Sequence, residues 1–115
     1  MKLTLNTFLS LDGVMQGPGG PDEDRTGGFD RGGWVVPFTD EGFGAVVSAW
    51  FAETDEILLG RATYTMMQTF WSQVTDPDDA VAASLNTRPK HVVSRTLQDP
   101  SWQNTSVIAL SLIHI

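Results

Sequence analysis

The fold of this chain is decided by the stretch Ile57-Leu58-Leu59-Gly60-Arg61-Ala62-Thr63. The short apolar run at residues 57–59 is typical of a buried strand, and it stops abruptly at a glycine. The residues after Gly60 carry a helical pattern, so the sequence changes from strand to helix at that position. Strands that alternate with helices in this way indicate an α/β protein with a largely parallel sheet.

A second stretch, Val92-Val93-Ser94-Arg95-Thr96, has the same character, because an apolar run ends in a hydroxyl residue and an arginine. A glycine lets a ligand approach the backbone, and the first N–H groups of a helix attract anions. Arginine adds a guanidinium that binds phosphate oxygens. One predicted phosphate site consists of Gly60, Arg61 and Thr63. The other consists of Ser94, Arg95 and Thr96. The alternative is that Arg61 and Arg95 pair with surface carboxylates.

Composition limits the classes of function. The chain has 115 residues and a net charge of −7, from 7 basic and 14 acidic side chains. It has room for one small domain, and it lacks the basic surface that nucleic acids or anionic membranes require. The absence of cysteine excludes disulfides, thiolate catalysis and cysteine-ligated zinc. No apolar run approaches the roughly 18 residues that span a bilayer, and the N-terminus does not resemble a signal peptide, so we expect a cytoplasmic protein.

The N-terminal region is predicted to begin with a strand over about residues 2–11, because apolar and polar residues alternate there. Its end leads Ser10 and Asp12 into a long glycine-rich loop that reaches about residue 38. We expect that loop to be a lid or binding segment, because Phe29 and Trp34 belong to a cluster too apolar to remain in water; the alternative is a floppy surface excursion. Asp12 binds substrate or orients a proton donor in one interpretation and is a turn residue in the other.

The remaining elements follow from capping and periodicity. Asp40 is expected to cap a helix with one buried face, and a helix from Arg61 is expected to bury its methionine and aromatic side in the core. That side consists of Thr63, Met66, Met67, Phe70 and Trp71. A turn at residues 75–79 leads into a short helix through Asn86, a strand at 91–94 and a last apolar stretch from Ser106. His91 and His114 lack partners at metal-ligand spacing, so no metal site is expected.

These motifs together resemble the dihydrofolate-reductase-like superfamily, over roughly residues 2–109. The matching stretches are Thr7-Phe8-Leu9-Ser10-Leu11-Asp12-Gly13-Val14-Met15, the long loop with its glycines and tryptophan, Leu58-Leu59-Gly60-Arg61-Ala62-Thr63-Tyr64 and Lys90-His91-Val92-Val93-Ser94-Arg95-Thr96. Within the superfamily the chain is most similar to the reductase-domain branch related to bacterial riboflavin biosynthesis, the RibD C-terminal domain type.

The resemblance implies a mixed, mostly parallel sheet flanked by helices that binds NADPH at its strand ends. Its NADPH-binding residues would be Phe8, Met15, Gly60, Arg61, Thr63, Ser94, Arg95 and Thr96, with the last three at the 2′-phosphate. Ser10 and Asp12 would be the catalytic pair, and Asp12, Phe29 and Trp34 would border the substrate. The implied substrate is a small heterocycle such as a pteridine or ribosylaminopyrimidine, as in 5-amino-6-(5-phosphoribosylamino)uracil reductases, and relatives commonly form homodimers.

The end of the chain departs from this resemblance. Family members continue with another strand, helices and a second glycine-rich segment, whereas this sequence stops at Ile115. We therefore expect residues 1–109 to be the N-terminal portion of a reductase domain and residues 110–115 to be an atypical apolar tail on a truncated product. The alternative to a reductase is a non-catalytic nucleotide-binding or dimerising module, or an inactive fragment.

Overall fold

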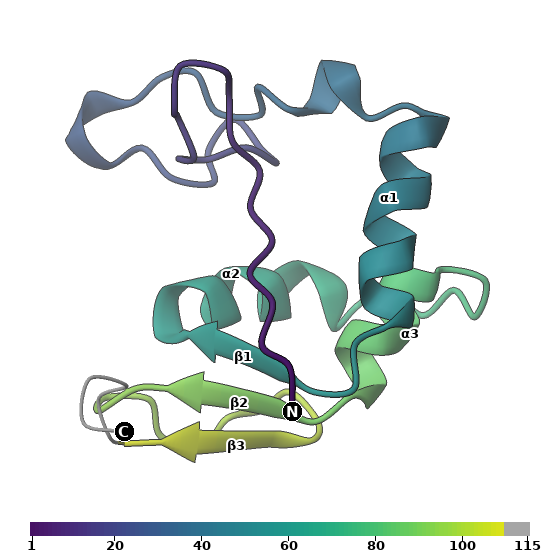
Figure 1. Ribbon diagram of the computed structural model, residues 1–115. Coiled ribbons are helices and arrows are strands. Elements are labelled where there is room, and N and C mark those ends of the chain that lie inside the picture. The colour runs from purple at the N-terminus through teal and green to yellow at the C-terminus, as the bar shows by residue number, and fades with distance from the viewer. Residues whose placement is uncertain (110–115) are drawn as a thin grey trace. The chain divides into compact units, whose positions relative to one another are not determined.

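The computed structural model describes residues 1–109. The chain divides into two compact units, a first unit of Met1–Gly44 and a second unit that begins at Ala45. The expected apolar tail at 110–115 lies outside the described residues. In chain order the elements are the 3₁₀ helices η1 (Thr26–Gly28) and η2 (Val36–Phe38), then α1 (Glu41–Ala52), β1 (Ile57–Gly60), α2 (Arg61–Trp71), α3 (Ala80–Thr87), β2 (Lys90–Val93) and β3 (Thr105–Ile108) (Figure 1).

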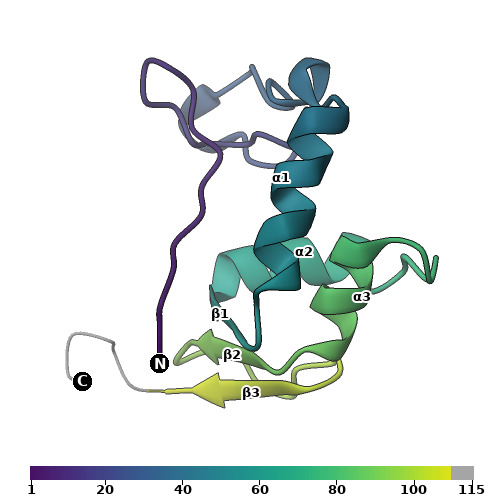
Figure 2. The same cartoon turned by 45° about the vertical axis from the view of Figure 1, so that its right-hand side comes forward.

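The second unit contains a three-stranded sheet in the order β1-β2-β3, and both strand pairs are parallel. The register places Gly60 opposite Val93 and Val93 opposite Ile108, so all three strands end at the same edge. Both views show the three arrows pointing in one direction (Figures 1 and 2). The α/β class expected from the sequence is confirmed.

Local capping accounts for the starts of the helices. The Asp40 carboxylate accepts a hydrogen bond from the Phe43 N–H at 2.8 Å, one turn into α1. Asp79 does the same for the Ala82 N–H at 2.9 Å at the start of α3. Both aspartates therefore satisfy helix N–H groups that have no carbonyl partner within the helix, as the sequence predicted.

The core of the second unit is built around Trp102, which is 3% exposed, together with Ile57, Tyr64, Leu85 and Val92. The prediction for the buried side of α2 was partly wrong. Tyr64 is buried and Met67 and Trp71 pack against the core, whereas Met66 and Phe70 are 40% and 62% exposed. Tyr64 can face the core because its hydroxyl accepts a hydrogen bond from the Trp102 N–H at 3.2 Å. A buried tyrosine needs such a partner, and the apolar period alone does not identify it.

Helix α1 also differs from expectation, because none of its residues is fully buried. Phe51 is partly buried and packs against the core of the second unit, while Val46 remains 52% exposed. The spacing of apolar residues therefore predicted the helix correctly but overstated how deeply its apolar side is covered.

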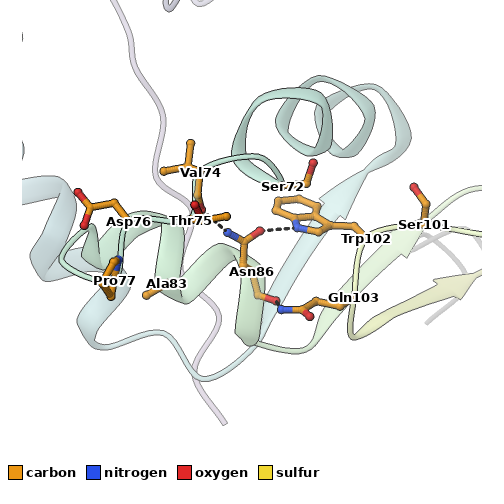
Figure 3. A pocket seen from close by; sticks show the side chains of 10 residues that line it. All are labelled: Ser72, Val74, Thr75, Asp76, Pro77, Ala83, Asn86, Ser101, Trp102 and Gln103. Atoms are coloured by element: carbon orange, nitrogen blue, oxygen red, sulfur yellow. Dashed lines mark hydrogen bonds between the residues drawn. The ribbon is translucent and has the colours of Figure 1, made fainter.

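Two polar side chains join the segments around Trp102. Asn86 donates through Nδ2 to the carbonyls of Trp71, at 3.0 Å, and Val74, at 3.2 Å, and its Oδ1 accepts from Trp102 Nε1 at 2.7 Å. Figure 3 shows Asn86 with Val74 and Trp102, and all three line an open pocket of about 460 Å³. Asn86 thus links the end of α2, helix α3 and the segment that leads into β3.

Lys90 is the second of these polar side chains, and it is 0% exposed. Its Nζ donates to the carbonyls of Leu85, at 2.7 Å, and Arg88, at 3.1 Å, and lies 4.6 Å from the centre of the Trp102 ring. Burial lowers the pKa of this amine. The lysine therefore satisfies carbonyls at the C-terminal end of α3, where a cation is also favoured by the helix dipole.

The predicted N-terminal strand is not found. Residues 1–10 carry no strand, and the sheet of the described residues consists of β1, β2 and β3. Alternation predicts which side chains share a face, but a strand forms only when a partner strand is paired with it. Leu3, Leu5 and Leu11 of this segment remain highly exposed, at 79%, 89% and 108%.

The glycine-rich loop of the first unit is held together by its own hydrogen bonds. Trp34 Nε1 donates to the Gln16 carbonyl at 2.9 Å, and the Gly33 N–H donates to the Gly17 carbonyl at 2.8 Å. A Cβ at Gly32 would lie 2.5 Å from the Gly20 carbonyl oxygen, so these two stretches of backbone approach too closely for any other residue. These contacts determine the path of the loop, and its role as a lid or binding segment stays a prediction.

Replacing Asn86 tests the network around Trp102. Asn86→Ala removes the side-chain donor to the Val74 carbonyl, the acceptor of the Trp102 indole N–H and one of two hydrogen bonds to the Trp71 carbonyl, which keeps the bond from the Val74 N–H. We therefore expect a loss of about 1–3 kcal/mol in the free energy of unfolding. Urea denaturation measures it. Thr87→Ala is the matched control in the same helix, since Thr87 is exposed, and it should change stability by less than about 0.5 kcal/mol. Equal effects of the two substitutions would contradict the role given to Asn86.

Candidate functional site

The candidate site lies where β1 and β2 end. Because these strands are parallel and Gly60 is opposite Val93, the residues that follow each strand emerge side by side at one edge of the sheet. Arg61 begins α2 directly after Gly60, and Ser94 follows Val93. The structure therefore brings together the two groups that the sequence predicted as phosphate sites. In parallel α/β sheets this is the edge where ligands bind.

Gly60 is not required by the fold of the described residues. Its backbone angles, φ −79° and ψ 162°, are available to any residue, and a Cβ built there meets no atom within 4 Å. No side chain caps the N-terminal end of α2. Gly60 and the start of α2 therefore leave open space beside helix N–H groups, an arrangement suited to the close approach of an anion.

The two arginines of the site make no ion pair within residues 1–109. The ion pair described there joins Arg25 to Asp22 at 3.3 Å, and a hydrogen bond joins His91 Nε2 to Glu56 Oε2 at 2.6 Å. Arg61 and Arg95 are both exposed. The alternative, in which surface carboxylates neutralise these arginines, is therefore not what the structure has, and both guanidinium groups remain accessible to a ligand.

Ser94 and Thr96 differ in their surroundings. Ser94 is 9% exposed, and its Oγ accepts the N–H groups of Thr96, at 3.1 Å, and Leu97, at 2.9 Å. Thr96 is exposed. Sequence reasoning did not identify this turn, although a serine two residues before the N–H it binds is a known signal for one.

Ser10 and Asp12 lie in the first unit and contact each other directly. The Ser10 hydroxyl donates to Asp12 Oδ1 at 2.6 Å and accepts the Val14 N–H at 2.8 Å. The bond from Ser10 is the largest cause of a lowered pKa for the Asp12 carboxyl. Asp12 is therefore ionised at neutral pH, where it accepts hydrogen bonds and does not supply a proton. It is also part of a tight turn, so its structure agrees with both interpretations made from the sequence.

The other predicted residues of the first unit are spread over its length. The ring of Phe8 lies 5.4 Å from the ring of Phe43, and Met15 is 58% exposed. Phe29 and Trp34 are both half-buried in the glycine-rich loop. These side chains all belong to the first unit, and their predicted roles at the nicotinamide and the substrate stay predictions.

The open pocket beside Asn86 is a separate feature of the second unit. It is lined by the segment that follows α2, by α3 and by the segment before β3, including Ser72, Asp76 and Gln103 (Figure 3). None of the predicted site residues lines it.

The three-stranded parallel sheet and its helices define an α/β domain. The chain belongs to the RibD C-terminal domain family, which it matches over residues 1–113. Members of this family are reductase domains related to riboflavin biosynthesis. A search of curated proteins finds no significant match. Among the helices of the described residues, none has the length and apolar character needed to cross a bilayer.

The Ser10–Asp12 contact predicts a measurable titration. Because the hydroxyl stabilises the ionised carboxylate, the Asp12 pKa lies below its ordinary value, and the contact is lost as the pH falls through that lowered pKa. Ser10→Ala should raise the Asp12 pKa toward its ordinary value. NMR titration of the side-chain carboxyl measures this, and Asp24, whose pKa is lowered by Thr26, is the internal control. An unchanged Asp12 pKa would contradict the assigned cause.

Proposed function

We propose that the chain is an NADPH-dependent reductase domain that acts on a small heterocyclic substrate, a pteridine or a ribosylaminopyrimidine. The observation that carries the proposal is the pair of exposed arginines, Arg61 and Arg95, without ion pairs at adjacent strand ends. In a chain of net charge −7, two accessible cations beside an open glycine favour a local, highly charged anion. Membership of a reductase family supports a nicotinamide cofactor as its source.

The cofactor phosphates are assigned from the chemistry of each strand end. The open space at Gly60 and the uncapped N–H groups of α2 suit the pyrophosphate, with Arg61 and Thr63 beside it. Arg95, Thr96 and Ser94 are assigned to the 2′-phosphate, which distinguishes NADPH from NADH. When bound, the nicotinamide supplies the hydride, and the protein binds and orients the reactants.

The substrate side of the proposal uses the first unit. The ionised Asp12 carboxylate, supported by Ser10, suits the N–H and amino groups of a flat heterocycle. Phe29 and Trp34 supply aromatic surface for such a ring. Phe8 and Met15 are assigned to the nicotinamide by family resemblance. A homodimer and a cytoplasmic location complete the proposal.

The first experiment is a titration of the protein with NADPH and with NADH, followed by tryptophan fluorescence. The chain has four tryptophans to report binding. Saturable binding that favours NADPH supports the proposal, and loss of NADPH absorbance on addition of a pteridine or ribosylaminopyrimidine establishes turnover. Binding without oxidation would instead identify a non-catalytic nucleotide-binding module. A folded sample that binds neither nucleotide contradicts both.

Arg95→Ala tests the 2′-phosphate assignment. We expect NADPH affinity to fall by roughly 1.5–3 kcal/mol, the contribution of a hydrogen bond to a charged group, while NADH affinity changes little. Calorimetry with both nucleotides measures the difference. Arg31→Ala, at another exposed arginine, is the matched control. Equal losses for NADPH and NADH would remove Arg95 from this role.

Gly60→Ala tests whether the glycine is required for nucleotide binding or for the stability of the fold. The new methyl group meets no protein atom within 4 Å, so thermal stability should be unchanged or slightly higher. NADPH and NADH affinities should fall together, because the methyl group occupies space that the pyrophosphate needs. Gly44→Ala, which also meets no atom within 4 Å, is the control. Unaltered binding by Gly60→Ala would contradict the pyrophosphate assignment.

A further inference from the structure

The hydroxyl of Ser94 is already engaged within the protein. Its oxygen accepts hydrogen bonds from two N–H groups, those of Thr96 at 3.1 Å and Leu97 at 2.9 Å. A serine oxygen has two acceptor positions, so both are used, and the O–H is left to donate to Thr96 Oγ1, 3.5 Å away. The residue is only 9% exposed. These contacts make Ser94 the closing side chain of the turn that follows β2.

The backbone of Ser94 is fixed as well. Its N–H donates to the Ile108 carbonyl at 3.0 Å, which extends the pairing between β2 and β3 by one residue. Arg95 therefore lies between a residue attached to the sheet and a residue, Thr96, whose N–H is held by the Ser94 side chain. The Arg95 side chain is exposed and makes no ion pair within residues 1–109. The turn thus holds the backbone of Arg95 while its guanidinium remains accessible.

We infer that Ser94 is a positioning residue that determines nucleotide specificity through Arg95, and that it is not itself a ligand of the 2′-phosphate. This inference rests on the proposed function, because it concerns the same phosphate. In this role the Ser94 hydroxyl does not contact the phosphate. It fixes the backbone from which the Arg95 side chain extends, so that backbone need not be ordered when the nucleotide binds. Thr96, whose side chain is exposed, remains a direct candidate ligand.

A double-mutant cycle tests this inference. NADPH and NADH affinities are measured for the unaltered chain, Ser94→Ala, Arg95→Ala and the double variant. If Ser94 acts through Arg95, Ser94→Ala lowers the NADPH-to-NADH preference several-fold when Arg95 is present and by less than about twofold when it is absent. A merely structural effect would weaken both nucleotides equally and leave the preference unchanged. Ser106→Ala, at an exposed serine of β3, is the control.

Two results would overturn the inference. The same loss of preference in both backgrounds would mean that the Ser94 hydroxyl contacts the phosphate itself. An unchanged preference in Ser94→Ala would mean that the turn does not control specificity.

A second measurement separates this inference from the proposed function. Amide exchange of Thr96 and Leu97 should be faster in Ser94→Ala, because both N–H groups lose their acceptor. Faster exchange in Ser94→Ala would show that the turn is as described. If Arg95→Ala nevertheless leaves the NADPH preference intact, the 2′-phosphate assignment fails, and the inference about specificity fails with it. Unchanged exchange would refute the turn itself.

Discussion

The parallel pairing of β1 with β2 is the constraint on which the second unit depends. Its register sets Ile57 opposite Lys90 and Leu59 opposite Val92, so these four side chains share the face that carries the core. A shift of one residue would turn that face outward. The same register brings Gly60 beside Val93, and thereby the open start of α2 beside the turn at Arg95. Core packing and the candidate phosphate site are therefore consequences of one strand alignment.

Elements with local signals could be predicted from the sequence. Asp40 and Asp79 each cap a helix whose start the sequence indicated, and the change from strand to helix at Gly60 identified both β1 and α2. Capping and strand-end chemistry act over a few residues, so they can be seen without a fold. The two stretches predicted to bind phosphate were identified by the same kind of local signal, and the parallel pairing of β1 with β2 places them side by side.

Features that depend on distant partners could not be predicted. The N-terminal segment has the alternation of a strand, yet it is not part of the described sheet. The apolar periodicity did not identify Tyr64 or Lys90 as buried residues. Tyr64 is buried because its hydroxyl bonds the backbone N–H of Trp102. Lys90 is buried because its amine bonds carbonyls near the end of α3 and lies over the Trp102 ring. The hydrophobic pattern of a sequence indicates which side chains favour the core. Burial of a side chain also requires that its polar atoms find hydrogen-bond partners.

The close approach at Gly32 changes the meaning of the loop's glycine content. Glycine is commonly taken as a sign of slackness, but here the backbone of Gly20 and Pro21 fills the space that a Cβ at Gly32 would occupy. In this part of the loop, the absence of a side chain at Gly32 allows two stretches of backbone to come into contact. Any larger residue at position 32 would push the two stretches of backbone apart. The glycine at this position therefore keeps the loop closed and does not serve to make it flexible.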